Sequence, residues 1–299
     1  MEKEPLCSII LLTYNHEKYV HNALISLIEQ DYNNIEIIVS DDCSPDNTWK
    51  IIKEIYNTFK EKRKIIINRN KQNLGLIQNL NKSLEMCSGE YIILHGGDDI
   101  SYKNRVTKIK NAFSIDENIT AVVAQSEYID NYNKIIGSTN RDEKMYALDD
   151  DYIKSMSFML GMQGLSIKRK VYEIFGPFLN TTPTEDSTFR LRAILLGKIY
   201  ESPDILLKYR VHKDSLSYSE NIYKLSTNLI AKQYVYDIKL SLKLGLINYK
   251  QYHRLKNKTR LYKIDRILSK SKSKYKKYRL CRIPFRLLQE INKYFLRFL

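Results

Sequence analysis

Acidic residues stand in pairs next to the predicted structural elements. Asp41–Asp42 and Asp98–Asp99 each follow an apolar run, the second pair after the turn Gly96–Gly97, and Glu185–Asp186 precedes a helical pattern. An apolar run bounded by turn residues is typical of a buried strand, and open α/β sheets bind ligands where such strands end. Carboxylates there can hold a divalent cation or take up a proton. The alternative is an ordinary surface turn, in which Gly-Asp and Asp-Asp pairs are also common.

Alternating strands and helices are expected to position these residues. Apolar runs predict strands at 8–13, 35–39, 65–67, 91–94 and 121–124, and each of the first four is followed by a segment with apolar residues at helical spacing. Short connections in such an alternation imply a parallel sheet with right-handed crossovers. The sequence therefore predicts an α/β fold, with a doubly wound and mostly parallel sheet flanked by helices.

The pattern is weaker in the second half of the chain. Residues 127–151 show no clear periodicity, whereas a strand is expected at 165–167, a loop at 176–184 and a helix from about Glu185. A late strand is expected at 208–211, and the residues beyond 220 are mainly helical in pattern, without an internal repeat.

Several nucleotide-dependent and hydrolytic classes are excluded by their missing motifs. The first turn, Thr13–Tyr19, has no glycine, although a dinucleotide-binding turn needs glycines for the approach of pyrophosphate. Neither G-x-x-x-x-G-K-[ST] nor G-x-S-x-G occurs. What remains is a sheet whose strand ends carry carboxylates, which are suited to a divalent cation that in turn binds phosphates.

The positive charge lies at the C-terminal end. The chain has a net charge of +15, and the segment 250–299 alone holds 17 Lys/Arg against 2 Asp/Glu. A basic tail indicates a polyanionic partner, either a membrane or nucleic acid, unless it is only a solvated tail. After the basic stretch, aromatic and aliphatic residues recur at helical spacing: Phe285, Leu288, Ile291, Tyr294, Phe295 and Phe298.

We interpret this tail as a membrane-surface anchor, since basic residues followed by an apolar helical face favour binding to anionic lipid. The alternatives are a helix that docks on the domain or on another subunit, and a nucleic-acid-binding segment in which tyrosines alternate with Lys and Arg.

Cysteine use and hydropathy bear on the compartment. Cys7, Cys43, Cys87 and Cys281 are far apart and show no C-x-x-C spacing, so neither a zinc site nor a disulfide framework is expected. We expect no signal peptide, because the first residues lead directly into a strand, and no apolar run reaches the ~18 residues that span a bilayer. A cytoplasmic protein at the inner face of the cell membrane is therefore expected.

Six segments together resemble the family-2 inverting glycosyltransferases of GT-A fold. They are Ser8–Asn15, Ile37–Thr48, Asn73–Gly75, Ser88–Asp99, Glu185–Asp186 with Arg192, and Tyr209–His212. The resemblance covers roughly residues 5–217. It implies transfer of a sugar from a nucleotide-diphosphate donor, expected to be a UDP-sugar, to a hydroxyl of a glycan or lipid-linked acceptor with inversion.

The resemblance also implies a division of the chain. Residues 1–219 would form the GT-A domain, with a nucleotide-binding half at 1–125 and an acceptor half at 126–219. Residues 220–299 would form a helical, basic C-terminal region. The alternatives in function are a basic nucleic-acid-binding protein and an inactive glycosyltransferase-like scaffold; the neutral body argues against the first.

The resemblance assigns the strand ends to the donor. Asp42 would accept a hydrogen bond from the base, and Tyr14 would pack on the base. The nucleotide-binding residues expected are Thr13, Tyr14, Asn15, Glu17, Asp41, Asp42, Asn73, Gly75 and Asp98. A divalent metal, Mn²⁺ or Mg²⁺, would be held by Asp99, Asp98 and His212. This chain has Gly96 where many relatives have an acidic residue, which favours a metal that arrives with the nucleotide.

Asp186 matches the family's catalytic base, which takes the proton of the acceptor hydroxyl. The alternative is that Glu185 and Asp186 only favour the start of a helix through its dipole. Arg192 would reach the diphosphate or form a structural ion pair. His212 is equally consistent with a structural role, and His95 is expected to be packed in the core.

Overall fold

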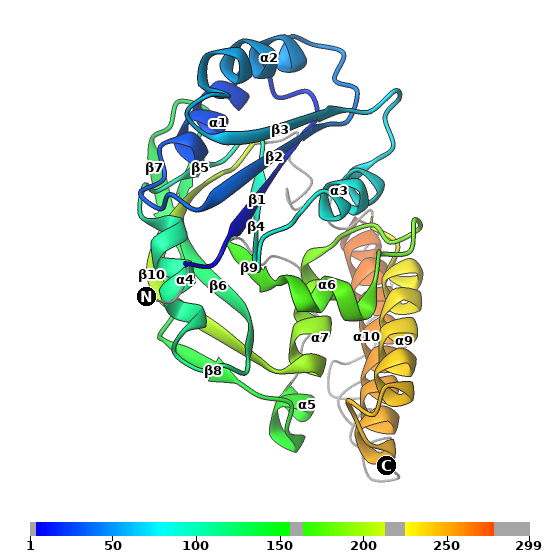
Figure 1. Ribbon diagram of the computed structural model, residues 1–299. Coiled ribbons are helices and arrows are strands. Elements are labelled where there is room, and N and C mark those ends of the chain that lie inside the picture. Colours follow the sequence, from blue (N-terminus) through cyan, green and yellow to red (C-terminus); the bar gives the residue numbers. More distant parts are fainter. Residues whose placement is uncertain (1–3, 156–163, 213–224, 278–299) are drawn as a thin grey trace.

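The computed structural model describes residues 4–155, 164–212 and 225–277 (Figure 1). Within these residues one twisted sheet forms the centre of the molecule, and helices lie on both of its faces. The prediction of an α/β sheet flanked by helices is thereby confirmed.

The first four long strands are parallel neighbours in the order β3-β2-β1-β4. They are β1 (Cys7–Thr13), β2 (Ile35–Asp41), β3 (Lys64–Arg69) and β4 (Tyr91–Gly96). The connections contain α1 (Val20–Ile28), α2 (Thr48–Phe59) and α3 (Leu76–Glu85). The predicted alternation is confirmed here, because each predicted strand and helix lies within or overlaps an observed element.

The second half of the sheet is mixed. Strand β9 (Leu165–Lys168) lies between β4 and β6 (Ile119–Ile129) and is antiparallel to both. Strand β10 (Lys198–Arg210) runs parallel to β6 over most of its length. Three short strands complete the sheet: β5 (Ile100–Ser101), β7 (Ile135–Ser138) and β8 (Lys144–Tyr146). The sheet therefore joins a parallel half to a half in which antiparallel pairs are frequent.

Alternate residues of each long strand bury against opposite helix layers. In β1, Ile9 and Leu11 pack with α1, α2 and α4 (Arg105–Phe113), whereas Ile10 packs with α3 on the other face. That second layer also contains α6 (Arg169–Phe175), α7 (Asp186–Leu196) and α9 (Thr227–Lys243). Because both faces of the parallel strands are covered, continuous apolar runs are what these strands require.

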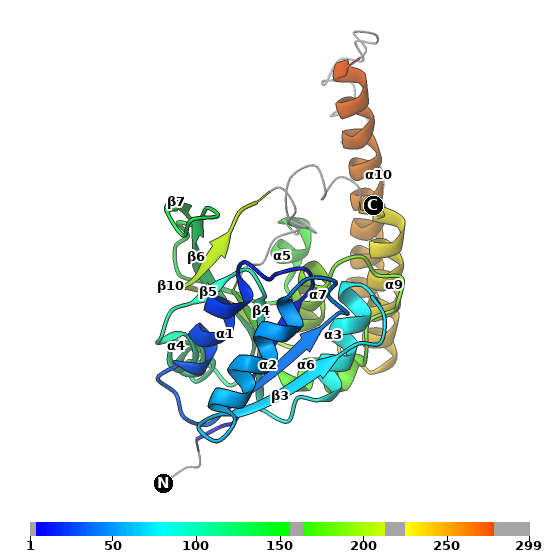
Figure 2. The ribbon, with the colours of Figure 1, turned by 90° about the horizontal axis from the view of Figure 1, so that it is seen from above.

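The C-terminal helices are joined to the domain through its core. Ile230, Tyr234 and Ile238 of α9 are buried in the same cluster as the sheet residues, and so is Leu255 of α10 (Tyr249–Lys277). Helix α10 continues beyond the end of α9 and projects from the body (Figure 2). Near its start, Lys250 and Arg254 pair with Asp150 of the short helix α5 (Asp150–Ser155).

The predicted aromatic helical face of the tail, Phe285–Phe298, lies outside the described residues. In the part that the structure describes, no helix is both long enough and apolar enough to span a bilayer.

Candidate functional site

The carboxyl ends of three parallel strands meet at one edge of the sheet. In the register of β1, Thr13 lies beside Asp41 of β2, and Leu12 lies beside Gly96 of β4. The loops that follow these strands carry the predicted nucleotide-binding residues and the Asp98–Asp99 pair. The sheet therefore brings together, at this edge, side chains that lie more than eighty positions apart in the sequence.

The loop after β1 is fastened to the loop after β2. Three backbone N–H groups of the first donate to side-chain oxygens of the second: Asn15 to Ser44 Oγ at 3.0 Å, His16 to Thr48 Oγ1 at 2.8 Å, and Glu17 to Asp46 Oδ2 at 3.0 Å. Asn47 donates in return to Glu17 Oε2. Of the predicted residues in the first loop, Tyr14 leaves 44% of its surface exposed and is free to contact a ligand.

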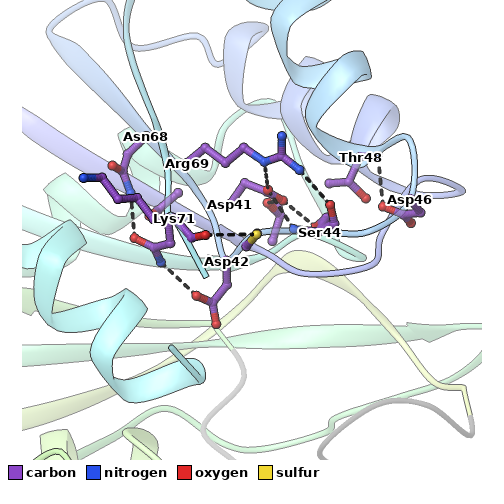
Figure 3. Close-up of polar contacts among 12 residues, drawn as sticks. Asp41, Asp42, Ser44, Asp46, Thr48, Asn68, Arg69 and Lys71 are labelled. Atoms are coloured by element: carbon purple, nitrogen blue, oxygen red, sulfur yellow. Dashed lines mark hydrogen bonds and ion pairs between the residues drawn. The ribbon is translucent and has the colours of Figure 1, made fainter. Parts of the chain in front are cut away.

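Asp41 is a structural member of this arrangement. Its side chain has no exposed surface and accepts hydrogen bonds from Thr13 and from the N–H and hydroxyl of Ser44. Figure 3 shows Arg69 reaching both Asp41 and Ser44; its Nε lies 3.5 Å from Asp41 Oδ2. Because its oxygens are taken up by these donors, the geometry assigns Asp41 to holding the loop rather than to contacting a nucleotide.

Asp42 orders the loop that precedes α3. It is 3% exposed and accepts three hydrogen bonds of 2.8 Å, from Asn70 Nδ2, Leu74 N and Gly75 N. Asn73 Oδ1 also accepts from Gly75 N, and Gly75 has a φ of +82°, a conformation that glycine adopts without steric cost. A carboxylate has about four acceptor positions, so one remains on Asp42 for a ligand.

The second acidic pair is joined to the end of β10. His212 Nε2 lies 2.9 Å from Asp98 Oδ2, and Arg210 donates its backbone N–H to Asp99 Oδ1 at 2.9 Å. Burial and the neighbouring Asp98 raise the pKa of Asp99 well above its usual value. Burial also acts to raise the pKa of Asp98, but the contact with His212 lowers it overall. The structure thus brings Asp98, Asp99 and His212 together, as predicted.

The two glycines before this pair have no room for side chains. A Cβ at Gly96 would lie 2.8 Å from Asp98 Oδ1, and a Cβ at Gly97 would lie 2.3 Å from His16 Nδ1. At position 96 the nearest atoms belong to the carboxylates of Asp98 and Asp99, which fold back over this position.

His16 is a site residue that the sequence analysis missed. It packs on Gly97, and its Nδ1 is buried without a hydrogen-bond partner among the described residues. Burial lowers the pKa of His16, partly offset by Asp98. The only signal in the sequence is its place in the Tyr14–Glu17 turn, which does not separate it from its neighbours.

Asp186 lies on a different element, at the first residue of α7. Burial and the adjacent Asp186 raise the pKa of Glu185 well above its usual value, which favours the neutral acid at Glu185. Of the two carboxyl groups, Glu185 is therefore the less suited to act as a base.

Arg192 forms an ion pair rather than facing a ligand. Its Nε lies 3.0 Å from Asp237 Oδ2, and neither side chain has any exposed surface. Of the two predicted roles, the structure shows the structural one. His95 is also packed as expected: it is 4% exposed, and burial lowers its pKa to about 3.

The candidate metal ligands fit a divalent cation only in part. Asp98 and His212 place a carboxylate oxygen and an imidazole nitrogen side by side, a donor set that Mn²⁺ accepts. Across residues 4–155, 164–212 and 225–277, no group of three or more His, Cys, Asp or Glu side chains is arranged to hold a metal. The described residues therefore provide two convergent ligands.

Comparisons with known proteins agree with one another. A model of glycosyl transferase family 2 matches residues 8–175. An uncharacterized glycosyltransferase of Haemophilus influenzae is 32% identical over 241 residues, which cover 78% of this chain and 73% of that protein.

Two solved structures share the fold. S. aureus TarS in complex with UDP-GlcNAc has a TM-score of 0.64 and 21% identity, covering 88% of this chain and 73% of that chain. The mannosyltransferase PcManGT from Pyrobaculum calidifontis, in complex with GDP-Man and Mn²⁺, has a TM-score of 0.61 and 16% identity, covering 98% of this chain and 81% of that chain.

Proposed function

This chain belongs to glycosyltransferase family 2, and we propose that it transfers a sugar from a UDP-sugar to a hydroxyl of a glycan or lipid-linked acceptor, with inversion at the anomeric carbon. The GT-A fold expected for the family is confirmed by the similar solved structures. The observation that carries the proposal is the meeting of the β1, β2 and β4 carboxyl ends, where Asp42 follows β2 and Asp98 follows β4, the strands on either side of β1.

The donor base would bind over the first two loops. Tyr14 offers an exposed ring to pack on the base, and Asp42 retains one acceptor position for a base N–H. Thr13, Asn15, Glu17, Asp41, Asn73 and Gly75 would act mainly by fixing these loops. A UDP-sugar in the similar TarS structure supports this donor class.

The diphosphate would lie near Asp98 and His212. These two residues would hold Mn²⁺ or Mg²⁺, and such a cation, when bound, stabilises the charge that develops on the departing diphosphate. Asp99 is less suited than Asp98 to ligate the cation directly, since its pKa is raised and one of its oxygens accepts from Arg210 N. Asp99 would instead support the turn that carries Asp98.

Asp186 would act as the general base. An acceptor hydroxyl is a weak nucleophile until a carboxylate takes its proton as the new bond forms. Attack on the face opposite the diphosphate would invert the anomeric centre. Glu185, with its raised pKa, would stay protonated beside Asp186.

The acceptor would be reached at the inner face of the cell membrane. The segment 250–299, with its 17 Lys/Arg, would bind anionic lipid headgroups, and attraction of about 1 kcal/mol per basic residue makes several sufficient. This placement suits a lipid-linked acceptor.

The proposal is tested in two steps. Nucleotide sugars are first compared for thermal stabilisation of the protein and for slow donor hydrolysis, with and without Mn²⁺. A UDP-sugar should raise the melting temperature in Mn²⁺; failure of every nucleotide sugar to bind would refute the proposal.

Asp186→Asn is then compared with wild type and with Asp142→Asn, which changes an exposed carboxylate in the segment between β7 and β8. Asp186→Asn should keep donor affinity and lose transfer by a factor of about 10² or more, while Asp142→Asn should keep both. Full transfer by Asp186→Asn would remove it as the base.

A further inference from the structure

We propose that Arg210 is a positioning residue of the donor site and that the turn between β6 and β7 holds it in place. The inference rests on the proposed function, since it takes Asp98 and His212 to be the diphosphate end of the donor site. It assigns a role in donor binding to Asp130 and Asn133, which lie more than thirty positions from the acidic pair in the sequence.

The inner side of Arg210 supports the acidic pair. Its Nε donates to the carbonyl oxygen of Asp98 at 2.8 Å, and its backbone N–H donates to the carboxylate of Asp99 at 2.9 Å. Two residues later, His212 Nε2 lies 2.9 Å from the Asp98 carboxylate. One short segment at the end of β10 thus contacts the main chain of Asp98 and the carboxylates of both acidic residues.

The outer side of Arg210 is fastened to the β6–β7 turn. Nη1 donates to the carbonyl oxygen of Asp130, and Nη2 donates to Asn133 Oδ1 at 2.6 Å. The ring of Tyr19 covers the guanidinium, with its centroid 4.6 Å from Cζ, and lies 5.5 Å from the ring of His212. Tyr19 is itself bound to the turn, because its hydroxyl donates to Asn131 at 3.1 Å.

The turn is rigid enough to serve as an anchor. Asp130 Oδ1 accepts from the N–H groups of Tyr132 and Lys134, at 2.8 and 3.0 Å. Asn133 has a φ of +66°, which Gly, Asn and Asp tolerate better than other residues. Of these three, Asn and Asp place an oxygen on the side chain that can accept from Arg210.

Burial explains why the anchor matters to the donor site. Arg210 is only 1% exposed, and the three oxygens that accept from its guanidinium in the described residues are uncharged. A buried guanidinium that loses one acceptor keeps an unpaired N–H, which is costly. The side chain would then move toward water and release the Asp98 carbonyl. Loss of the Asn133 oxygen should therefore weaken donor binding at a distance.

The test compares three variants of the turn. Asn133→Gly keeps the backbone conformation and removes the acceptor; Asn133→Asp keeps both the conformation and an oxygen; Tyr132→Ala changes a side chain that is 90% exposed in the same turn. UDP-sugar affinity in Mn²⁺ is measured by calorimetry, well below the lowest melting temperature of the set, together with KM and kcat.

Asn133→Gly should weaken donor binding about tenfold and raise the donor KM by a similar factor, the equivalent of one charge-assisted hydrogen bond. Asn133→Asp and Tyr132→Ala should stay within about twofold of wild type. The rescue by Asn133→Asp separates positioning from a general loosening of the turn.

Two results would overturn the inference alone: donor affinity of Asn133→Gly equal to wild type, or no rescue by Asn133→Asp. A wild-type protein that binds no nucleotide sugar would instead overturn the proposed function, and this inference with it. A second variant, Arg210→Lys, keeps the charge but not the planar fork and should also weaken donor binding; unchanged binding would contradict the role of Arg210.

Discussion

The acidic side chains at the strand ends make different contacts, although they are the same residue type in similar sequence positions. Asp41 and Asp42 accept hydrogen bonds that fix two loops, and only Asp42 keeps an acceptor position for a ligand. Asp98 meets His212, whereas Asp99 lies deeper and accepts from Arg210. These differences come from the partner each carboxylate finds, which the residue type does not determine.

Gly97 gives a test of the packing between the turn after β4 and the loop after β1 that carries His16. In Gly97→Ala the new Cβ would lie 2.3 Å from His16 Nδ1 and 3.0 Å from the Leu12 carbonyl oxygen, so the turn must shift. We expect donor binding at least about tenfold weaker and a loss of stability of about 1–3 kcal/mol from overpacking. Calorimetry and urea unfolding measure the two effects.

Gly137→Ala is the matched control, because its Cβ would meet Tyr128 at an ordinary 3.4 Å. Equal donor affinity in the two alanine variants would contradict the close packing of His16 on Gly97.

Glu36 gives a pH-dependent prediction at the opposite end of the strands. Burial would raise its pKa, but hydrogen bonds from Lys64, Ser88 and Ser8 lower it to about 2, against 4.5 for an ordinary Glu. A carboxyl group with a lowered folded-state pKa stabilises the protein fully above its unfolded-state value. This contribution is lost as pH falls from about 4.5 toward 2.

Glu36→Gln should therefore lower the free energy of unfolding at pH 7 by about 2 kcal/mol. The difference from wild type should shrink as pH falls below 4.5. Urea unfolding at pH 7 and pH 3 measures it, and a gap that stays constant between these values would show that Glu36 is not ionised in the fold.

At the scale of elements, the sequence predicted the long buried strands and missed the shortest ones. Each of the first four strands is a continuous apolar run because both of its faces are covered. Strands β5, β7 and β8 have two to four residues and form through pairing with β6 or β10. The local sequence pattern does not predict this pairing. Strand β10 begins ten residues before the predicted strand, since a polar stretch around Pro203 interrupts its apolar pattern.

The candidate site was likewise predictable in part from the sequence. The paired carboxylates and His212 carry recognisable signals, and the structure brings Asp98, Asp99 and His212 together. The roles of His16 and Arg210 could not be predicted, because they depend on contacts between segments that are distant in sequence. Arg192 was ambiguous for the same reason, since its partner Asp237 lies on α9.

The ion pair of Arg192 and Asp237 locks α7 to α9. Arg192 Nη1 also donates to Gly176 O at 2.8 Å, and Gln233 Nε2 donates to Asp237 Oδ1 at 3.0 Å. Asp237→Ala would leave the guanidinium buried and unpaired, so we expect a loss of about 3–5 kcal/mol in unfolding free energy.

The double variant Arg192→Met with Asp237→Leu should lose less than Asp237→Ala alone, because no unpaired charge remains. Denaturant unfolding of both variants measures the two losses in unfolding free energy. A cost of less than about 1 kcal/mol for Asp237→Ala would mean that the ion pair contributes little to the attachment of α9.

At the scale of the whole molecule, the packing of α10 determines where the basic region can be removed. Leu255 is fully buried and Thr259 is 2% exposed, whereas Ile264 is 53% exposed. A chain that ends at Lys263 should therefore keep the melting temperature of the full chain, while one that ends at Asn248 should lose several kcal/mol through the lost burial of Leu255.

The chain that ends at Lys263 lacks 11 Lys/Arg and 2 Asp/Glu. It should bind vesicles of phosphatidylcholine and phosphatidylglycerol much more weakly than the full chain, since each basic residue contributes about 1 kcal/mol. Co-sedimentation measures this, with pure phosphatidylcholine vesicles as the control. Equal binding of both chains to the anionic vesicles would place the membrane contact elsewhere.

The position of β9 between β4 and β6 sets the order in which the sheet can close during synthesis. Strands β1 to β4 and then β6 leave the ribosome before β9, yet in the part of the sheet that the structure describes β9 is the strand that pairs with both β4 and β6. Until Leu165–Lys168 emerges, the nascent chain carries open edges on both strands. Such edges pair readily with other chains. A pause in translation that keeps Leu165–Lys168 inside the ribosome should therefore increase aggregation more than a pause after this strand has emerged.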